Sequence, residues 1–180
     1  MVFFKALAEN KGCIISQVET FPETQLLLVG RDSPDTISGN VSTWEMMQPL
    51  FSAKALKNTI YLGGVPYEEI KVHIQKATLC VFPTFAEALP VSWLEAMAMQ
   101  KAIVASEIGW GKEIVEDGKN GCLAYPSDHE KYSERIVKLL EDPINRNKIE
   151  KQARERILDC FDSPVVALKN IEFYKKIVNS

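Results

Sequence analysis

Two carboxylates stand on either side of a proline in the stretch FAEALPVSWLEAM, where seven residues separate Glu87 from Glu95. On one continuous helix, at about 100° per residue, this separation would put both acids on nearly the same face. Pro90 lies between them, and a proline inside a helix removes a hydrogen bond and clashes with the preceding turn. We therefore expect Glu87 in a loop and Glu95 in the first turns of the helix that follows Pro90.

The chemistry that suits these acids is the binding of hydroxyl groups. A carboxylate can accept hydrogen bonds from two hydroxyls at once, as the edge of a ribose or a hexose requires. Each acid also has a plainer interpretation. Ser92 and Glu95 match a Ser-x-x-Glu capping box, which the spacing alone favours for Glu95. Glu87 has the alternative of a solvated loop carboxylate, so spacing by itself leaves both roles open.

Short apolar runs, separated by stretches of helical period, provide the elements that would hold these acids. The runs are MVFF, TQLLLVG, TIYLG, ATLCVFP, KAIVAS and GCLAY. Strands that alternate with helices predict a parallel sheet. LLLV and LCVF are apolar at every position, which is typical of strands covered by helices on both faces. We predict an α/β fold with a doubly wound parallel sheet of about six strands.

The helices follow from apolar periodicity and from prolines at helix starts. The first four predicted segments are a helix over 12–20, a helix over 42–55, a loop over 31–40 and a helix over 66–76 that opens at Pro66. After residue 127 the pattern is purely helical. The three C-terminal helices are predicted over 128–141, over 143–159 from Pro143 and over 164–178 from Pro164. Their inner stripe is predicted to be Ile149, Ala153, Ile157 and Leu158.

The loop with Glu87 follows a predicted strand, so it leaves the sheet at that strand's carboxyl end. Ligands of open parallel sheets bind outside these carboxyl ends, often with a phosphate at a helix N-terminus. We expect the backbone amides of Val91 and Ser92 to point into this crevice. Trp93 and Trp110 flank it, and packing in the core or in a lid is favoured over sugar stacking for both.

Composition excludes several classes of protein. The 180 residues suit one soluble globular domain, with 46% hydrophobic and 25% charged residues. The net charge of −3 provides no basic face for nucleic acid. No apolar run reaches the roughly 18 residues of a membrane span, and the first residues lack the pattern of a signal peptide. We expect a cytoplasmic protein.

Cysteine and histidine spacing gives no indication of a metal site. The four cysteines, Cys13, Cys80, Cys122 and Cys160, are far apart and are interpreted as reduced residues, the first three in the core. His73 and His129 have no second ligand at helical spacing. The segment RDSPD is not an Asp-x-Asp motif. We predict that the protein holds no metal and no cofactor.

A more specific pattern covers residues 62–128. A glutamate, seven residues and a second glutamate followed by Ala-Met-Ala occur at Glu87 and Glu95, and the phrase EIVEDGKNG follows later. In these features the sequence resembles the C-terminal, donor-binding domain of retaining GT-B glycosyltransferases, the group 1 glycosyl transferases, which include glycogen and sucrose synthases. The resemblance extends over essentially the entire chain and implies a Rossmann-like fold.

The resemblance implies a role for individual residues. Glu87 would face the transferred sugar, and Glu95 would hold the ribose of the nucleotide. The turn near Val65 would border the base, and Lys11 would stabilise the leaving diphosphate. The loop between the acids would supply backbone donors to the sugar and the diphosphate. That loop consists of Leu89, Pro90, Val91 and Ser92.

Two places depart from the family's pattern. The family has a basic pair after the first strand in a Gly-Arg...Lys-Gly phrase, which here reads KALAENKG. Lys11 matches the lysine, but Lys5 replaces the glycine and Ala6 replaces the arginine. Pro90 stands where glycine is common, so one backbone donor is missing. We expect an altered sugar-diphosphate contact at a site that is retained.

The implied activity is transfer of a hexosyl unit from a nucleoside-diphosphate sugar to a glycan or lipid-linked acceptor, with retention of configuration. Such an enzyme has two Rossmann-like halves, and the resemblance covers one. We therefore interpret residues 1–180 as a single donor-binding domain that is inactive alone and needs an acceptor-binding half before it. Residues 164–178 would cross back to that half, which would also make any peripheral contact with the inner face of the membrane.

Two other hypotheses compete with this one. A degenerate GT-B domain, kept for assembly or nucleotide binding without transfer activity, is suggested by Ala6 and Pro90. A dinucleotide oxidoreductase falls behind because no G-x-G-x-x-G follows the first strand. The sequence leaves open the base, the sugar, the acceptor and the oligomeric state.

Overall fold

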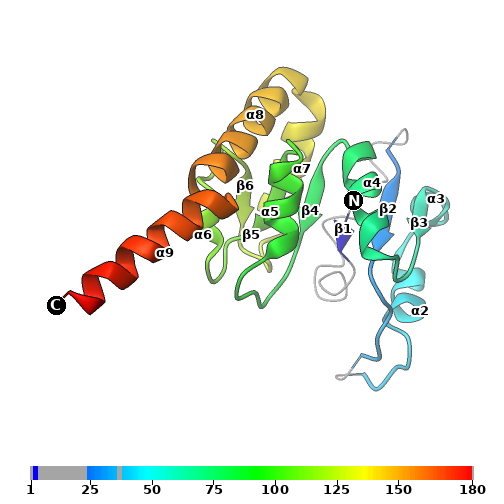
Figure 1. Ribbon diagram of the computed structural model, residues 1–180. Helices are drawn as coiled ribbons and strands as arrows, with labels where there is room; N and C mark the ends of the chain where they lie inside the picture. The colour runs from blue at the N-terminus through cyan, green and yellow to red at the C-terminus, as the bar shows by residue number, and fades with distance from the viewer. Residues whose placement is uncertain (1, 4–23, 36–37, 180) are drawn as a thin grey trace.

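A parallel sheet of six strands organises the part of the protein that the structure describes. The computed structural model describes residues 2–3, 24–35 and 38–179 (Figure 1). The strand order is β3-β2-β1-β4-β5-β6, and every neighbouring pair is parallel. The strands are β1 (Val2–Phe3), β2 (Leu26–Val29), β3 (Thr59–Tyr61), β4 (Cys80–Phe82), β5 (Ile103–Ser106) and β6 (Cys122–Ala124). This order confirms the predicted doubly wound α/β fold.

Side chains that alternate along β2, β4, β5 and β6 build two hydrophobic clusters. Along β4, Val81 belongs to one cluster, whereas Cys80 and Phe82 belong to the other. In the same way Val104 of β5 is separated from Ile103 of the same strand. Successive strand residues point to opposite faces, so the two clusters cover the two faces of the sheet. Covered faces explain why β4 and β5 are buried at every position.

The helices pack on these two faces. Residues of α7 (His129–Glu141) join the first cluster, together with residues of α2 (Thr43–Met47) and α3 (Ala53–Lys57). Residues of α4 (Tyr67–Lys76), α5 (Val91–Ala98) and most buried positions of α8 (Pro143–Cys160) join the second. A one-turn helix, α6 (Gly111–Ile114), was not predicted. The predicted helix over 12–20 lies outside the described residues.

The predicted single helix over 42–55 is wrong. The chain forms α2, a short 3-10 turn η2 (Gln48–Leu50) and then α3. Pro49 lies in the 3-10 turn, and Phe51 then adopts an extended backbone with ψ 142°. Ser52 starts a new helix, because its hydroxyl accepts a hydrogen bond from the Ala55 amide. Helical periodicity continues across this break, but the proline removes the hydrogen bond that one helix would need.

Other helix boundaries lie close to those predicted. α7 begins after Asp128, whose carboxylate caps it, and α8 begins at Pro143 as expected. Pro66 precedes the first residue of α4 rather than being it. The inner stripe of α8 contains three of the four predicted residues. Leu158 is the exception, with 43% of its surface exposed.

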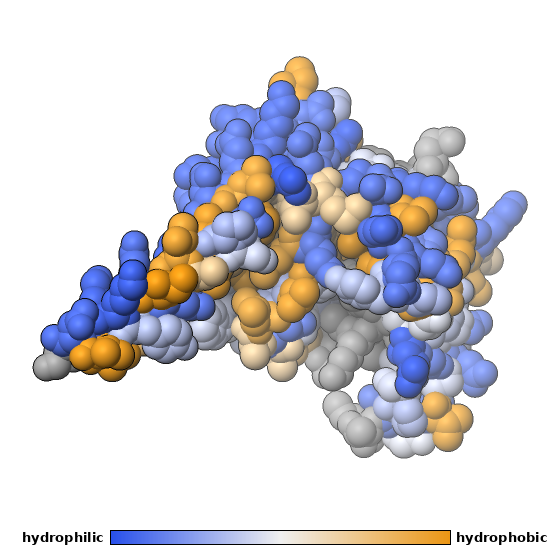
Figure 2. All heavy atoms as spheres, in the orientation of Figure 1, coloured by the Kyte–Doolittle hydropathy of each residue, from blue (hydrophilic) through white to orange (hydrophobic). Residues whose placement is uncertain are grey.

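The last helix, α9 (Ser163–Val178), extends away from the sheet beyond its contact with α8 (Figure 1). It has no buried residue, and apolar side chains lie along it in the space-filling view (Figure 2). Exposed apolar residues of α9 include Val166, Leu168, Ile171, Phe173, Tyr174, Ile177 and Val178. No helix among the described residues combines the length and the apolar character needed to cross a bilayer.

Cysteine placement agrees with the expectation of core thiols where the structure describes it. Cys80 and Cys122 are buried and free, and Cys160 is partly buried and free. Burial raises the pKa of the Cys80 and Cys122 thiols above the ordinary value of 9.0, because it disfavours the charged thiolate. Cys13 lies outside the described residues.

Candidate functional site

The strand order reverses between β1 and β4, which are neighbours in the sheet although the chain winds away from them in opposite directions. In doubly wound sheets this switch point leaves a crevice at the carboxyl ends of the two strands. β4 ends at Phe82, and the loop 83–90 that follows contains Glu87. The first predicted acid therefore lies on a loop that leaves the sheet at its switch point. Lys11 follows β1 in the sequence and lies outside the described residues.

A buried set of hydroxyl groups holds the end of β4. The Phe82 carbonyl accepts hydrogen bonds from Tyr132 Oη at 2.9 Å and from Ser106 Oγ at 3.2 Å. Ser106 Oγ in turn accepts one from the Thr84 amide at 2.9 Å. Ser106 and Tyr132 are at most 1% exposed, and buried hydroxyls are stable when hydrogen-bonded in this way. The chain therefore enters the loop with Glu87 from a fixed point.

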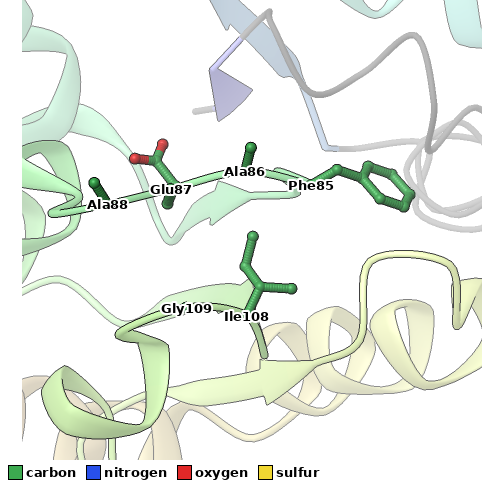
Figure 3. Close-up of a pocket in the computed structure, with 6 residues that line it drawn as sticks. All are labelled: Phe85, Ala86, Glu87, Ala88, Ile108 and Gly109. Atoms are coloured by element: carbon green, nitrogen blue, oxygen red, sulfur yellow. The ribbon is translucent and has the colours of Figure 1, made fainter.

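The loop with Glu87 borders an open pocket of ≈ 430 Å³ (Figure 3). Its lining residues are Phe85, Ala86, Glu87, Ala88, Ile108 and Gly109. Gly109 has φ +47°, and a Cβ added to it would lie 2.6 Å from the Glu87 carbonyl oxygen. In Figure 3 the Glu87 carboxylate points away from Gly109 and Ile108. Contact with Gly109 thus fixes the backbone of Glu87 from one side, while the carboxylate extends from the other.

The two tryptophans near this loop differ. Trp93 is buried in the second hydrophobic cluster, with its ring centroid 6.1 Å from that of Phe82. This confirms core packing for Trp93. Trp110 precedes α6 and is 55% exposed, so it is not a core residue.

The predicted capping box at the start of α5 is wrong. Pro90 occupies the N-cap position, and no side chain caps the helix. Ser92 is the second helical residue, whereas a capping box needs its serine at the N-cap. Glu95 is therefore in the second helical turn, out of register with the capping position. Its carboxylate is used for a different contact.

The backbone donors at this helix start are fewer than predicted. The Val91 amide donates to the Leu89 carbonyl at 3.0 Å, so it is not directed to a ligand. The Trp93 amide donates to the Pro90 carbonyl at 3.0 Å. No acceptor for the Ser92 amide occurs in the described part of the chain. Leu89 and Val91 expose their side chains, and Pro90 is buried.

Glu95 accepts a hydrogen bond at Oε1 from the hydroxyl of Tyr67. This hydrogen bond, and next the negative charge of Glu95, raise the pKa of the Tyr67 phenol above the ordinary 10.0. Tyr67 is the first residue of α4, and Val65 comes two residues earlier and packs against the second cluster. The fold thus brings the predicted base-bordering turn to the second acid. Sequence reasoning missed Tyr67, whose only local signal was an aromatic residue directly after Pro66.

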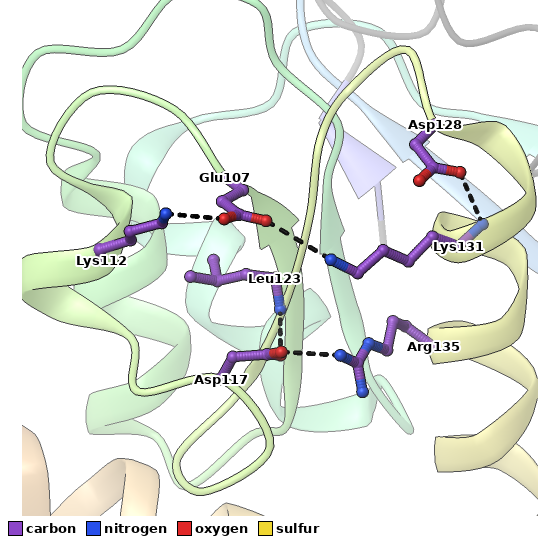
Figure 4. A network of polar contacts seen from close by, with 7 residues as sticks. All are labelled: Glu107, Lys112, Asp117, Leu123, Asp128, Lys131 and Arg135. Carbon is purple, nitrogen blue, oxygen red and sulfur yellow. Dashed lines mark hydrogen bonds and ion pairs between the residues drawn. The ribbon is translucent and has the colours of Figure 1, made fainter.

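Ion pairs hold the basic side chains of Lys112, Lys131 and Arg135, which follow β5 in the chain (Figure 4). Glu107 contacts Lys112 at 2.8 Å and Lys131 at 3.5 Å. The hydrogen bond from Lys112 is the main reason that the pKa of the Glu107 carboxyl lies below its ordinary 4.5. Arg135 pairs with Asp117 at 2.7 Å. These three cations are therefore committed to carboxylates of the protein.

The phrase EIVEDGKNG forms a structural turn between α6 and β6. The Glu116 amide donates to Asn120 Oδ1 at 2.9 Å, and Asn120 is buried. Asp117 accepts from the Leu123 amide at 2.9 Å, and Gly118 has φ +75°. These contacts fix the turn that leads into β6. Among the described residues, no three His, Cys, Asp or Glu side chains form a group that could hold a metal ion.

Comparison with known proteins decides the family. The model of the glycosyl transferases group 1 family matches residues 3–156. The chain belongs to this family. It is also 32% identical over 189 aligned residues to the alpha-maltose-1-phosphate synthase of Mycolicibacterium smegmatis. That alignment covers 98% of this chain and 48% of the synthase, so the chain spans about half the length of that relative.

Solved structures confirm the fold of this glycosyltransferase domain. The C-terminal domain of a glycosyl transferase group 1 family protein (LpcC) from Francisella tularensis has a TM-score of 0.78 and 20% identity. That comparison covers 91% of this chain and 84% of the other. HepE of Anabaena, solved in complex with UDP, has a TM-score of 0.78 and 22% identity. The comparison with HepE covers 99% of this chain and 48% of the HepE chain. The fold is thus the Rossmann-like half of a GT-B glycosyltransferase.

Proposed function

We propose that this chain is the nucleotide-sugar-binding half of a retaining glycosyltransferase. The enzyme would transfer a hexosyl unit from a nucleoside-diphosphate sugar to a glycan or lipid-linked acceptor. Residues 1–180 would form one donor-binding domain, and an acceptor-binding half would complete the active site. The 48% coverage of the maltose-1-phosphate synthase supports a partner half of similar size. We infer that the isolated domain has negligible transfer activity, because the acceptor site would lie on the other half.

One observation carries this proposal: both acids lie on the connection that leaves β4 at the switch point of the sheet. Glu87 is on the loop that borders the pocket, and Glu95 is on the following helix beside Tyr67. The helix that carries Glu95, α5, starts between the two acids in the sequence and at the carboxyl edge of the sheet, so its positive dipole end faces the same region. This order of groups along the chain suits a nucleotide-sugar. The first carboxylate can accept hydrogen bonds from sugar hydroxyls, the helix N-terminus can bind the diphosphate, and the second carboxylate can accept hydrogen bonds from the ribose.

Each group has a proposed task. Glu95 would accept a ribose hydroxyl, and Glu87 would accept a hydroxyl of the transferred sugar. The Ser92 amide and the start of α5 would bind the diphosphate, with the backbone of Leu89, Pro90 and Val91 shaping the loop beside it. Val65 would border the base. Lys11 would offset the negative charge that develops on the leaving diphosphate, as fixed charges do in such reactions.

We propose that the reaction needs no metal or other cofactor, because the charges on the protein would stabilise the leaving group. The enzyme would act in the cytoplasm, and any contact with the inner face of the membrane would be peripheral and made by the acceptor-binding half. Nucleic acid is not a proposed partner, since the net charge is −3.

Titration of the 180-residue chain with a panel of nucleoside diphosphates by calorimetry tests this proposal. The Glu95→Gln change keeps the size of the side chain but removes its charge. Loss of a hydrogen bond to a charged acceptor should weaken nucleotide binding by roughly 10- to 100-fold. Glu155→Gln, at an exposed position of α8, is the matched control. Lys11→Ala should weaken nucleoside diphosphates more than nucleosides.

A degenerate domain is the second candidate, and the start of α5 favours it. Pro90 has no amide hydrogen, and the Val91 amide already donates to Leu89. A diphosphate would therefore find few backbone donors there. No heat of binding for any nucleoside diphosphate at millimolar concentration would support this candidate over the first.

A further inference from the structure

Tyr67 is a large aromatic residue at an exposed place. It lies on the same face of α4 as Ile70 and Ile74, which pack into the second hydrophobic cluster. Tyr67 continues this face beyond the end of the core, and 68% of its surface is exposed. Its backbone is thus fixed by a packed helix, although its ring gains little from burial. Packing alone gives no reason for a tyrosine at this position.

Among the residues that the structure describes, the hydroxyl of Tyr67 has one hydrogen-bond partner, the carboxylate of Glu95. Glu95 is equally well anchored, because its neighbours Trp93, Ala96 and Met97 place α5 in the core. Within residues 24–35 and 38–179, no lysine, arginine or histidine forms an ion pair with Glu95. Tyr67 is also the one hydrogen-bond donor to this carboxylate in the same part of the chain. Two helices that pack into the same hydrophobic cluster are therefore linked by this side-chain hydrogen bond.

That contact leaves most of the carboxylate available. An ionised carboxylate has two oxygens and about four lone-pair sites, and Tyr67 uses one site on Oε1. A glutamate without a partner samples several rotamers and loses that freedom when a ligand binds it. A glutamate already held by a neighbouring hydroxyl has less freedom to lose. The geometry thus prepares Oε2 of Glu95 to meet a ligand.

We propose that Tyr67 is a positioning residue that holds the Glu95 carboxylate for the ribose hydroxyls of the nucleotide, and that it thereby contributes to the choice of ribose over deoxyribose. This inference rests on the proposed function, because it takes Glu95 as the ribose ligand. It adds a residue on a different element, α4, to the two acids on the connection after β4. Recognition of the ribose then depends on how α4 and α5 are placed by the hydrophobic cluster into which both helices pack.

If Tyr67 hindered ribose binding rather than helping it, removal of its hydroxyl would change the nucleotide affinity in the opposite direction. If the Tyr67 hydroxyl blocked Glu95, a ribose would have to displace it before binding. Removal of the hydroxyl would then tighten binding of the nucleotide. Tyr67→Phe separates these cases, because it removes the oxygen and keeps the exposed ring.

The experiment measures calorimetric affinities for two ligands, the nucleoside diphosphate that binds the wild type best and its 2′,3′-dideoxy analogue. In Tyr67→Phe we expect the ribonucleotide to bind roughly three- to tenfold more weakly, as the lost positioning predicts, with the dideoxy analogue within about twofold. In a Glu95→Ala background, Tyr67→Phe should have no further effect on either ligand. Tyr174→Phe, at an exposed position of α9, is the control and should change neither affinity.

Several results would overturn the inference. Equal ribonucleotide affinity in wild type and Tyr67→Phe would show that Tyr67 does not position Glu95. Equal losses for both ligands would show a general effect on the domain, and tighter binding would show a gate. Each of these leaves the proposed function intact, since the wild type still binds. Absence of nucleotide binding by the wild type would refute the proposed function and this inference together.

Discussion

Gly109 offers a direct test of how the fold holds Glu87. The backbone at Gly109 has φ +47°, and a Cβ there would lie 2.6 Å from the Glu87 carbonyl oxygen, a separation that real side chains do not adopt. Gly118 has a similar backbone, with φ +75°, but a Cβ there would meet nothing within 4 Å. Gly118→Ala therefore isolates the cost of the left-handed backbone. Gly109→Ala adds the clash with Glu87.

The two costs are separable in magnitude. A left-handed backbone costs an alanine roughly 1 to 2 kcal/mol relative to glycine, and the alanine regains part of that through a less flexible unfolded chain. We expect Gly118→Ala to lower the free energy of unfolding by about 1 kcal/mol. Gly109→Ala should lower it by about 2 to 4 kcal/mol, because overpacking against backbone adds roughly 1 to 3 kcal/mol. These losses correspond to a decrease in Tm of about 2 to 4 °C per kcal/mol.

Urea unfolding of both variants measures this difference, and calorimetry with a nucleoside diphosphate and its sugar derivative follows the functional consequence. We expect Gly109→Ala to bind the nucleotide normally and to lose the additional affinity for the sugar derivative, because Glu87 has moved. Gly118→Ala should bind both ligands as the wild type does. If Gly109→Ala is no less stable than Gly118→Ala, the loop with Glu87 yields freely and the reasoning is wrong.

Two further predictions concern the surroundings of the site. Tyr132→Phe removes one of the two hydrogen bonds that hydroxyl groups donate to the Phe82 carbonyl. It should lower the free energy of unfolding, measured by urea titration, by about 1 to 2 kcal/mol. Unchanged stability would contradict the anchoring of β4. In the folded protein, Lys112 lowers the pKa of Glu107 below 4.5, so the ion pair stabilises the fold above that pH and is lost as the pH falls through the lowered pKa. The stability difference between wild type and Lys112→Met should therefore shrink when urea unfolding is repeated from pH 6 down to pH 3, and a constant difference would refute the pairing.

Much of the fold follows from local sequence. Strands such as β4 and β5 are apolar at every position because helices cover both faces of the sheet, and this composition is visible without a structure. Helix starts at Asp128 and Pro143 are readable because a capping carboxylate or an N-terminal proline acts within one turn. The break within 42–55 was not predicted, because its apolar periodicity continues through a segment that Pro49 prevents from forming one helix.

The candidate site, like the fold, was predicted from the sequence only in part. The spacing of Glu87 and Glu95 around Pro90 indicated a loop acid and a helix acid, and both lie where expected along the chain. The capping box did not form, because the helix begins at Val91 rather than after Ser92. A shift of two residues at a helix start is enough to change the partner of a side chain, and sequence periodicity does not fix boundaries that closely.

The sequence by itself determined the alternation of strands and helices along the chain, the coverage of the sheet on both faces and the pair of acids after β4. Only the tertiary structure decided the strand order, the approach of Gly109 to Glu87 and the hydrogen bond from Tyr67 to Glu95. Tyr67 and Glu95 are 28 residues apart, on different helices. Local patterns report which face of an element is apolar, whereas a contact between two elements depends on how those faces pack together.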